Sequence, residues 1–206
     1  MADKAHRETD EKLNAIERYL ARLYAEQEEE AVVLVSSFFQ HFSDEDKKMR
    51  KKFLNGAITK EEYQKWRKSK IYHSKHFSKL KKELSESLFV LNQKAVNYIN
   101  GQLSDIYLLN YNAAADIPNI TGFDTIDKPS EKAEENLPYK ELKKNKDVQW
   151  NSKKIDALVL FGLSQLSPLE EIPSRARAIV RTNQSASVTY AGTMVTGAEN
   201  LGRHNS

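Results

Sequence analysis

Apolar residues in the first half of the chain recur at steps of three and four, the spacing that places side chains on one face of a helix. One stripe, within residues 5–42, consists of Leu13, Ile16, Leu20, Leu23, Gln27, Ala31, Leu34 and Phe38. A second stripe consists of Phe77, Leu80, Leu84, Leu88, Leu91, Ala95 and Tyr98. A helix over residues 5–42 would be roughly 55 Å long, so it needs a partner helix along its length. We therefore predict an all-α fold in which residues 1–111 form a long antiparallel helical hairpin.

The segment between the two stripes contains signals for shorter helices. Ser43 with Asp46 is typical of the start of a helix, and the pair Asn55–Gly56 is typical of its end. Thr59 with Glu62 matches the T-x-x-E capping box, which predicts that another helix starts there.

The second long helix is expected to run over residues 59–100, with or without a break near His73. The Asn-Gly pair at positions 100 and 101 is expected to end it. A short helix over residues 102–108 would then direct Tyr107 and Tyr111 toward a core.

Helix-breaking residues are concentrated in the second half of the chain. All five prolines come after residue 117, and the first 100 residues contain one glycine. Residues 112–145 combine prolines, aspartates and a glycine with little periodicity, so we predict a loop-rich linker there. Residues 146–206 are predicted to form a smaller C-terminal helical unit, and its first helix has one apolar face. That face consists of Ile155, Leu158, Val159 and Leu163.

The segment SASVTYAGTMV, residues 185–195, is ambiguous. One set of residues, Ala186, Val188, Tyr190, Gly192 and Met194, alternates with another, Ser187, Thr189, Ala191 and Thr193. This alternation is typical of a strand, and the pattern alone slightly favours that interpretation. The alternative is a helix whose small side chains, Ser187, Ala191 and Ala198, allow close packing against a neighbour.

The charge is unevenly distributed along the chain. The net charge of the whole chain is +3, but residues 47–82 carry +12, between a preceding segment of −7 and a following segment of −4. Lysines bind phosphates with release of counterions, and aromatic side chains within this segment could stack on bases. A solvated lysine-rich surface with its aromatic residues in a helix interface is the main alternative, and an acidic protein partner is the third. The candidate contacts with DNA or an acidic partner are Lys47, Lys48, Arg50, Lys51, Lys52, Lys65, Arg67, Lys68, Lys75, Lys79, Lys81 and Lys82.

Motifs for catalysis and for cofactor binding are missing from the sequence. There is no cysteine, which excludes disulfides, thiolate metal ligands and a thiol nucleophile. No apolar run reaches the roughly 18 residues of a membrane span. The chain has no G-x-x-x-x-G-K, G-x-G-x-x-G or G-x-S-x-G motif and no dense His/Asp cluster. We therefore expect no enzyme activity, no cofactor and no membrane span.

Residues 98–112, YINGQLSDIYLLNYN, resemble the block ING-x-L-x-x-I-Y-x-x-N-Y-N of the Mu F-like minor head (head morphogenesis) proteins of tailed bacteriophages. Three more blocks resemble this family in the same order. They are NGAITKEEYQKW at residues 55–66, VQWNSKKIDALVLFGLSQLSPLEEIPSRA at 148–176 and MVTGAENLGR at 194–203. The chain departs from the family pattern around residues 165–167, where the second glycine of a G-x-x-x-G region is replaced. It departs again at residues 191–193, where family members often have A-R-T.

The resemblance implies a low-copy virion protein inside the head, made in the host bacterial cytoplasm and associated with the portal vertex. Such a protein would assist head assembly, DNA packaging or DNA delivery, and its partners would be the portal or the major capsid protein, with packaged double-stranded DNA as a further partner. The resemblance carries over no catalytic residue, and it favours a helix for the last segment. The alternative function is that of a basic helical nucleic-acid-binding protein acting outside virions.

Overall fold

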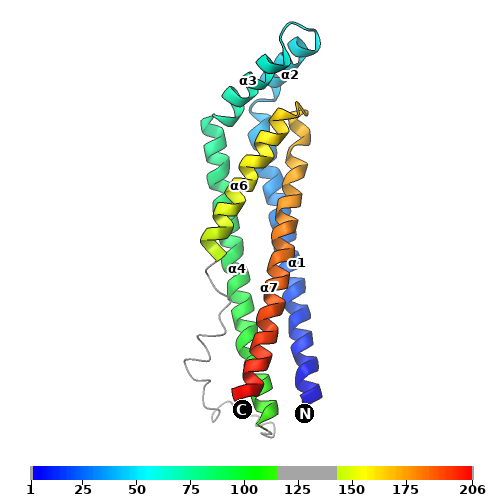
Figure 1. Ribbon diagram of the computed structural model, residues 1–206, viewed down its shortest axis with the longest axis vertical. Coiled ribbons are helices and arrows are strands. Elements are labelled where there is room, and N and C mark those ends of the chain that lie inside the picture. Colours follow the sequence, from blue (N-terminus) through cyan, green and yellow to red (C-terminus); the bar gives the residue numbers. More distant parts are fainter. Residues whose placement is uncertain (1, 116–142, 206) are drawn as a thin grey trace. The chain divides into compact units, whose positions relative to one another are not determined.

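The computed structural model describes residues 2–115 and 143–205, and every regular element in these ranges is helical (Figure 1). The long helices are α1 (Ala2–Gln40), α4 (Lys75–Ala114), α6 (Lys143–Ser164) and α7 (Ala176–Asn205). The shorter elements are α2 (Ser43–Leu54), α3 (Lys60–Arg67), the π-helical turn η1 (Lys68–Tyr72) and the 3-10 turns η2 (Leu169–Glu171) and η3 (Pro173–Arg175). The all-α prediction is confirmed. Of the predicted linker over residues 112–145, residues 116–142 lie outside the described residues.

The described residues form two compact units, and neither is continuous in sequence. The first unit contains residues 2–23, 92–115 and 184–205, and the second contains residues 24–91 and 143–183. The described residues of the predicted C-terminal unit, 146–206, are divided between these two units. α6 and α7 each have an apolar face that has to be buried against other helices, and these faces are buried against α1 and α4.

In the first unit, parts of α1, α4 and α7 pack around one core. The rings of Tyr19 and Tyr98 stack with centroids 4.0 Å apart, and Lys12 Nζ donates to Asp105 Oδ2 at 2.8 Å. These contacts show that α1 and α4 run antiparallel, as predicted for the hairpin. The buried apolar side chains include Ile16, Leu20, Ile99, Leu103, Ile106 and Val195.

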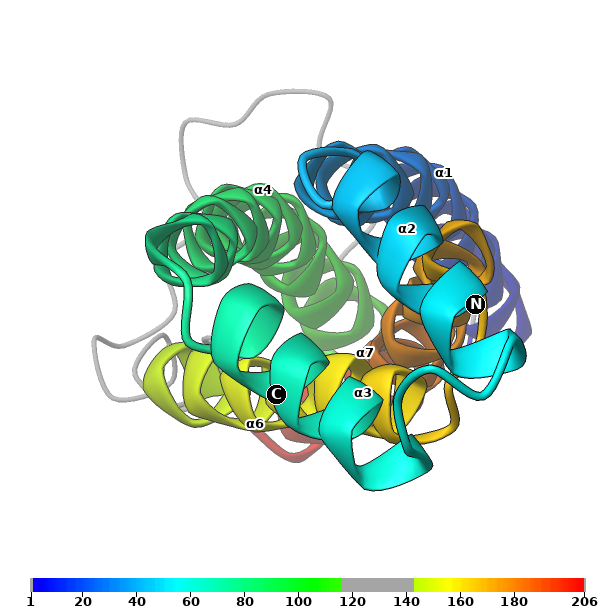
Figure 2. The ribbon, with the colours of Figure 1, turned by 90° about the horizontal axis from the view of Figure 1, so that it is seen from above.

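In the second unit, α1 and α4 are again antiparallel and are joined by α6 and α7. Gln27 Nε2 donates to Ser87 Oγ at 2.9 Å, and the rings of Phe38 and Phe77 lie 5.7 Å apart. α2 and α3 lie side by side at one end of this unit (Figure 2). We call α2 and α3 the arm.

The helix ends around the arm are partly as predicted. The capping box is present: Glu62 N donates to Thr59 Oγ1 at 3.1 Å, and Thr59 N donates to Glu62 Oε2 at 2.7 Å. α2 ends before Gly56, whose φ of 71° is the left-handed conformation that glycine tolerates. The predicted Ser43 cap is wrong, because the N-cap of α2 is Phe42, without a side-chain hydrogen bond, and Asp46 bonds elsewhere.

The Asn-Gly pair at positions 100 and 101 does not end a helix, because α4 continues to Ala114. A glycine inside a helix costs about 1 kcal/mol relative to alanine. Burial of Ile99, Leu103, Ile106 and Tyr107 outweighs that cost, since each fully buried large apolar side chain contributes about 2 kcal/mol. The sequence left open whether the helix breaks near His73, and the structure has a break there, between η1 and α4.

The ambiguous segment at residues 185–195 is helical, as part of α7. Its buried side chains step by three and four, through Ala191, Val195 and Ala198, and do not alternate. Local β propensity is therefore overridden by tertiary packing. The threonine hydroxyls of this helix donate to carbonyls one turn earlier, for example Thr193 Oγ1 to Thr189 O at 3.1 Å.

Candidate nucleic-acid interface

A buried ion pair joins the two helices of the arm. Arg67 Nε donates to Asp46 Oδ1 and Arg67 Nη2 donates to Asp46 Oδ2, both at 2.8 Å. Both side chains are buried. Tyr63 Oη donates to Asp46 Oδ1 at 2.8 Å, and burial raises the pKa of Tyr63 above its ordinary value. The carboxylate thus accepts three hydrogen bonds, which compensate for its removal from water.

The arm is also hydrogen-bonded to the end of α6 and to the segment that follows it. Arg67 Nη1 donates to Ser167 O at 2.9 Å, and Gln64 Nε2 donates to Ser164 O at 2.9 Å. Arg67 was among the predicted DNA or acidic-partner contacts, and this assignment is wrong because the residue is fully buried. Its role is to hold the arm in place.

Sequence reasoning did not pair Asp46 with Arg67, which lie 21 residues apart. One signal was present. Asp46 shares a face of α2 with Met49 and Phe53, and a carboxylate on an otherwise apolar helix face needs a buried cation or several donors.

The outer surface of α2 carries the most available positive charge of the arm. Lys47 and Lys51 are four residues apart, as are Lys48 and Lys52, so the four form two adjacent rows, all exposed. Within the described part of the chain, no carboxylate lies within ion-pair distance of these four lysines. Arg50 is half-buried on the inner side of the same helix.

Lys65 of α3 and Lys68 of η1 are exposed on the second helix of the arm. The aromatic residues between the lysines mostly face inward. Tyr63 is buried and stacks on Phe53 with centroids 5.5 Å apart, and buried Phe77 packs against Tyr72 at 4.8 Å. Of the interpretations left open by the sequence, the packing of these rings agrees with aromatic residues in a helix interface.

The lysines at the start of α4 differ from those of α2 because carboxylates neutralise most of them. Lys79 pairs with Glu83 at 3.5 Å, and Lys82 pairs with Glu86 at 3.7 Å. Lys81 is half-buried and pairs with Asp156 at 3.4 Å. Lys75 is exposed. The positive potential is therefore stronger at α2 than at α4.

The arrangement suits contact with a phosphate backbone. Lysines on one helix surface can neutralise phosphates without reading sequence, because sequence is read by side chains placed at base edges. The exposed acidic residues of α2, Asp44 and Glu45, lie in its first turn, and Lys51 and Lys52 lie in its last, as the helix dipole favours.

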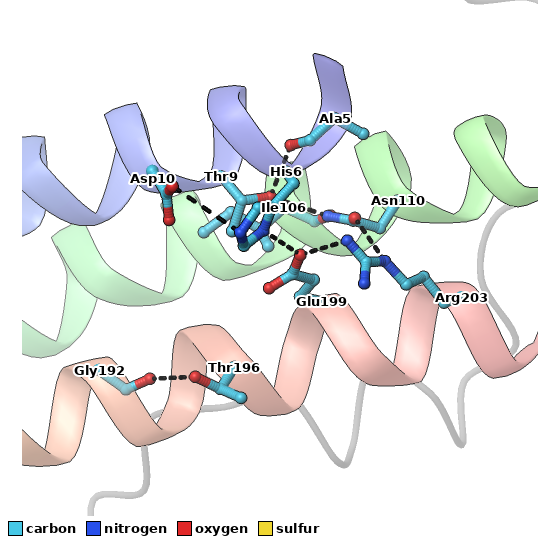
Figure 3. Close-up of polar contacts among 10 residues, drawn as sticks. All are labelled: Ala5, His6, Thr9, Asp10, Ile106, Asn110, Gly192, Thr196, Glu199 and Arg203. Atoms are coloured by element: carbon cyan, nitrogen blue, oxygen red, sulfur yellow. Dashed lines mark hydrogen bonds and ion pairs between the residues drawn. The ribbon is translucent and has the colours of Figure 1, made fainter. Parts of the chain in front are cut away.

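A second polar cluster, in the first unit, joins α1, α4 and α7 (Figure 3). Asn110 Nδ2 donates to Thr9 Oγ1 at 2.9 Å, Arg203 Nε donates to Asn110 Oδ1 at 3.3 Å, and Arg203 Nη2 donates to Glu199 Oε1 at 2.5 Å. His6 Nδ1 and Glu199 Oε1 lie 2.8 Å apart. Thr9, Asn110 and Glu199 are buried, so these bonds fix the relative position of three helices.

The backbones of α4 and α7 approach closely beside this cluster. A Cβ on Gly202 would lie 2.5 Å from Tyr107 O and 3.1 Å from Asn110 Cβ, so the position requires glycine. The sequence blocks at residues 98–112 and 194–203 therefore meet here. In the second unit, the blocks at 55–66 and 148–176 meet through the Gln64–Ser164 bond.

In the second unit, two arginines of α7 hold a glutamate pair of α1. Arg181 Nε donates to Glu28 Oε2 at 3.0 Å, and Arg177 Nη1 donates to Glu28 Oε1 at 3.1 Å and to Glu29 Oε1 at 2.6 Å. The hydrogen bonds from the two arginines, chiefly the one from Arg181, lower the pKa of Glu28. Burial of the carboxylate acts in the opposite direction. No pattern in the sequence indicates this pairing.

Fold and site together define an all-helical protein with a basic helical arm. Among residues 2–115 and 143–205, no group of three or more His, Asp or Glu side chains could hold a metal ion. No helix in these ranges is long and apolar enough to span a bilayer. Comparisons with models of protein families, with curated proteins and with solved structures gave no match.

Proposed function

We propose that this chain is a minor capsid protein of a tailed bacteriophage, of the Mu F-like head morphogenesis class. It lies inside the head at the portal vertex, bound to the portal or the major capsid protein. There it assists head assembly, DNA packaging or DNA delivery. This function needs no catalytic residue and no cofactor.

One structural observation supports the proposal in addition to the sequence resemblance. The blocks that resemble the family are far apart in sequence, yet their residues contact one another in pairs. Gly202 and Arg203 of the last block pack on Tyr107 and Asn110 of the block at residues 98–112. Residues that jointly form one close contact constrain each other, which gives a physical reason for the blocks to occur together.

The basic surface of α2 supports a contact with DNA in this role. Lys47, Lys48, Lys51 and Lys52 are exposed, and no carboxylate of the described residues pairs with them. Packed DNA presents a dense array of phosphates, and these lysines would bind it without sequence preference. The same surface equally suits the alternative function, a nucleic-acid-binding protein acting outside virions.

Mass spectrometry of purified phage particles separates the two functions. Particles should be banded by density, washed in high salt and digested, and the peptides of this chain quantified against the portal protein. The proposal predicts a constant, low ratio to the portal protein in every band of filled heads. Absence from filled heads, with the protein detected in the infected-cell lysate, would support the alternative.

A further inference from the structure

A cleft with apolar and basic walls lies between α6 and the elements α3 and η1 of the second unit. It has a volume of about 770 Å³ including the space open to solvent, and it is lined by Gln64, Lys68, Leu160, Phe161, Leu163 and Ser164. We call it the α6 cleft. Phe161 is 56% exposed and Leu160 36%, which is unusual for large apolar side chains of a helix whose other face is buried.

The charged residue among those that line the α6 cleft is Lys68. Exposed Lys65 lies one turn earlier on α3. Arg175 lies with its Cζ atom 5.4 Å from the centre of the Phe161 ring. Asp156, which lies in the part of α6 whose side chains the structure describes, is paired with Lys81. An occupant of this cleft should therefore combine an exposed apolar side chain with carboxylates.

The outer face of α1 in the same unit has this composition. Glu26, Glu30 and Val33 are spaced by four and three residues, so they share one helix face, and all three are exposed. Val33 is 60% exposed. Glu29 lies beside them but is already bonded to Arg177. We call Glu26, Glu30 and Val33 the acidic face of α1.

A single molecule cannot join these two surfaces. Ala31 and Val35 of α1 line an internal cavity together with Ile155 of α6, so they point toward α6. Val33, two residues from each, lies about 160° away around the helix and points outward. Figure 2 shows α1 and α6 on different sides of the second unit.

We propose that the α6 cleft binds the acidic face of α1 of a second copy of this chain. Such a contact is heterologous, because two different surfaces meet, and it continues from copy to copy into a ring or a chain. The apolar part of the contact is small, so the association is transient, and its charges make it sensitive to salt.

Sedimentation velocity of the full chain, without nucleic acid and at low salt, tests this proposal. We expect the weight-average mass to rise with protein concentration and to fall back when salt is added. Phe161→Asp should abolish the rise, whereas Leu54→Asp should leave it unchanged, since Leu54 is 69% exposed on α2 and lies outside both surfaces. A parent chain that stays monomeric at every concentration, or equal effects of the two variants, would overturn the proposal.

Charge reversal provides the sharper arm of the experiment. One variant carries Lys65→Glu and Lys68→Glu in the cleft, and the other carries Glu26→Lys and Glu30→Lys on α1. Each variant alone juxtaposes like charges and should be monomeric, with unchanged helix content in circular dichroism. An equimolar mixture restores opposite charges at every contact and should regain the concentration-dependent mass. If the mixture stays monomeric, the two surfaces are not partners.

Discussion

Arg67 of α3 donates hydrogen bonds to both carboxylate oxygens of Asp46 of α2, each at 2.8 Å. The pair is buried, and Tyr63 supplies a third hydrogen bond to the same carboxylate. Because α2 carries the exposed lysines, this contact sets where the basic surface of the arm lies relative to the rest of the second unit.

Asp46→Asn should destabilise the protein by about 3 kcal/mol, because it leaves the Arg67 guanidinium buried without a counter-charge. Urea unfolding followed by circular dichroism measures the loss. Asp44→Asn is the matched control, since Asp44 is exposed in the same turn of α2 and its replacement should cost well under 1 kcal/mol. Equal effects of the two substitutions would show that the buried pair contributes nothing.

Gly202→Ala should destabilise the first unit by about 2 kcal/mol. The added Cβ would lie 2.5 Å from the backbone oxygen of Tyr107, which cannot move without shifting α4. Gly197→Ala on the same helix is the control: a Cβ there meets nothing within 4 Å, and the change should stabilise α7 by up to about 1 kcal/mol. Opposite signs in thermal unfolding are expected, and a neutral Gly202→Ala would mean that the helices are not so close.

Replacing the four lysines of α2, Lys47, Lys48, Lys51 and Lys52, with glutamine should weaken binding to double-stranded DNA. The plot of log K against log salt concentration should become flatter by up to about 3.6, since each phosphate contact contributes roughly 0.9 to the slope. Fluorescence anisotropy with two unrelated duplexes, between about 50 and 200 mM salt, measures both affinity and slope.

The lysines of α4 provide the comparison for that experiment. A second variant should also bind DNA more weakly than the parent, but should lose less affinity than the α2 variant, because three of the replaced side chains are paired with carboxylates. In this variant glutamine replaces Lys75, Lys79, Lys81 and Lys82. Helix content should be unchanged in both variants. If the α2 variant binds as well as the parent at low salt, its lysines form a solvated surface or a protein-docking site, and the DNA contact should be abandoned.

Glu28→Gln should lower the melting temperature at pH 7 by roughly 3 °C. The pKa of Glu28 is lower in the folded than in the unfolded protein, chiefly because of Arg181, so the unfolded state binds more protons. The stabilisation is therefore present above the unfolded pKa and is lost as the pH falls through the folded pKa. The difference between parent and variant should narrow below about pH 4. Glu30→Gln is the control, since Glu30 is exposed on the same helix, and it should leave the melting temperature at pH 7 almost unchanged.

The periodic part of this fold is readable from the sequence. The second predicted stripe is buried from Phe77 through Ala95, because a run of apolar residues at helical spacing can only be satisfied by a partner helix. The pairing of that stripe with the first also follows from length, since a helix of about 55 Å cannot stand alone.

The contacts between distant residues could not be predicted in the same way. The position of Asp46 on an apolar face of α2 indicates that it needs a buried partner, but Arg67 is identified as that partner only once α2 and α3 are placed side by side. Gly101 looks like a helix end until the burial of Leu103 and Ile106 is known. The division into these two units could not be predicted for a related reason: an apolar face on α7 shows that the helix needs cover, but not which helix provides it.

The proposed location inside the head is tested most directly by protease protection of intact particles. Purified filled heads should be treated with trypsin, the protease inactivated, and the chain quantified by mass spectrometry against an untreated sample, with an exposed tail protein as the positive control for digestion. We predict that peptides from the lysine-rich α2 remain at full abundance in intact heads and are lost once the heads are opened. Absence of the chain from the particles, or its digestion while the heads are intact, would contradict a minor capsid protein of the head interior.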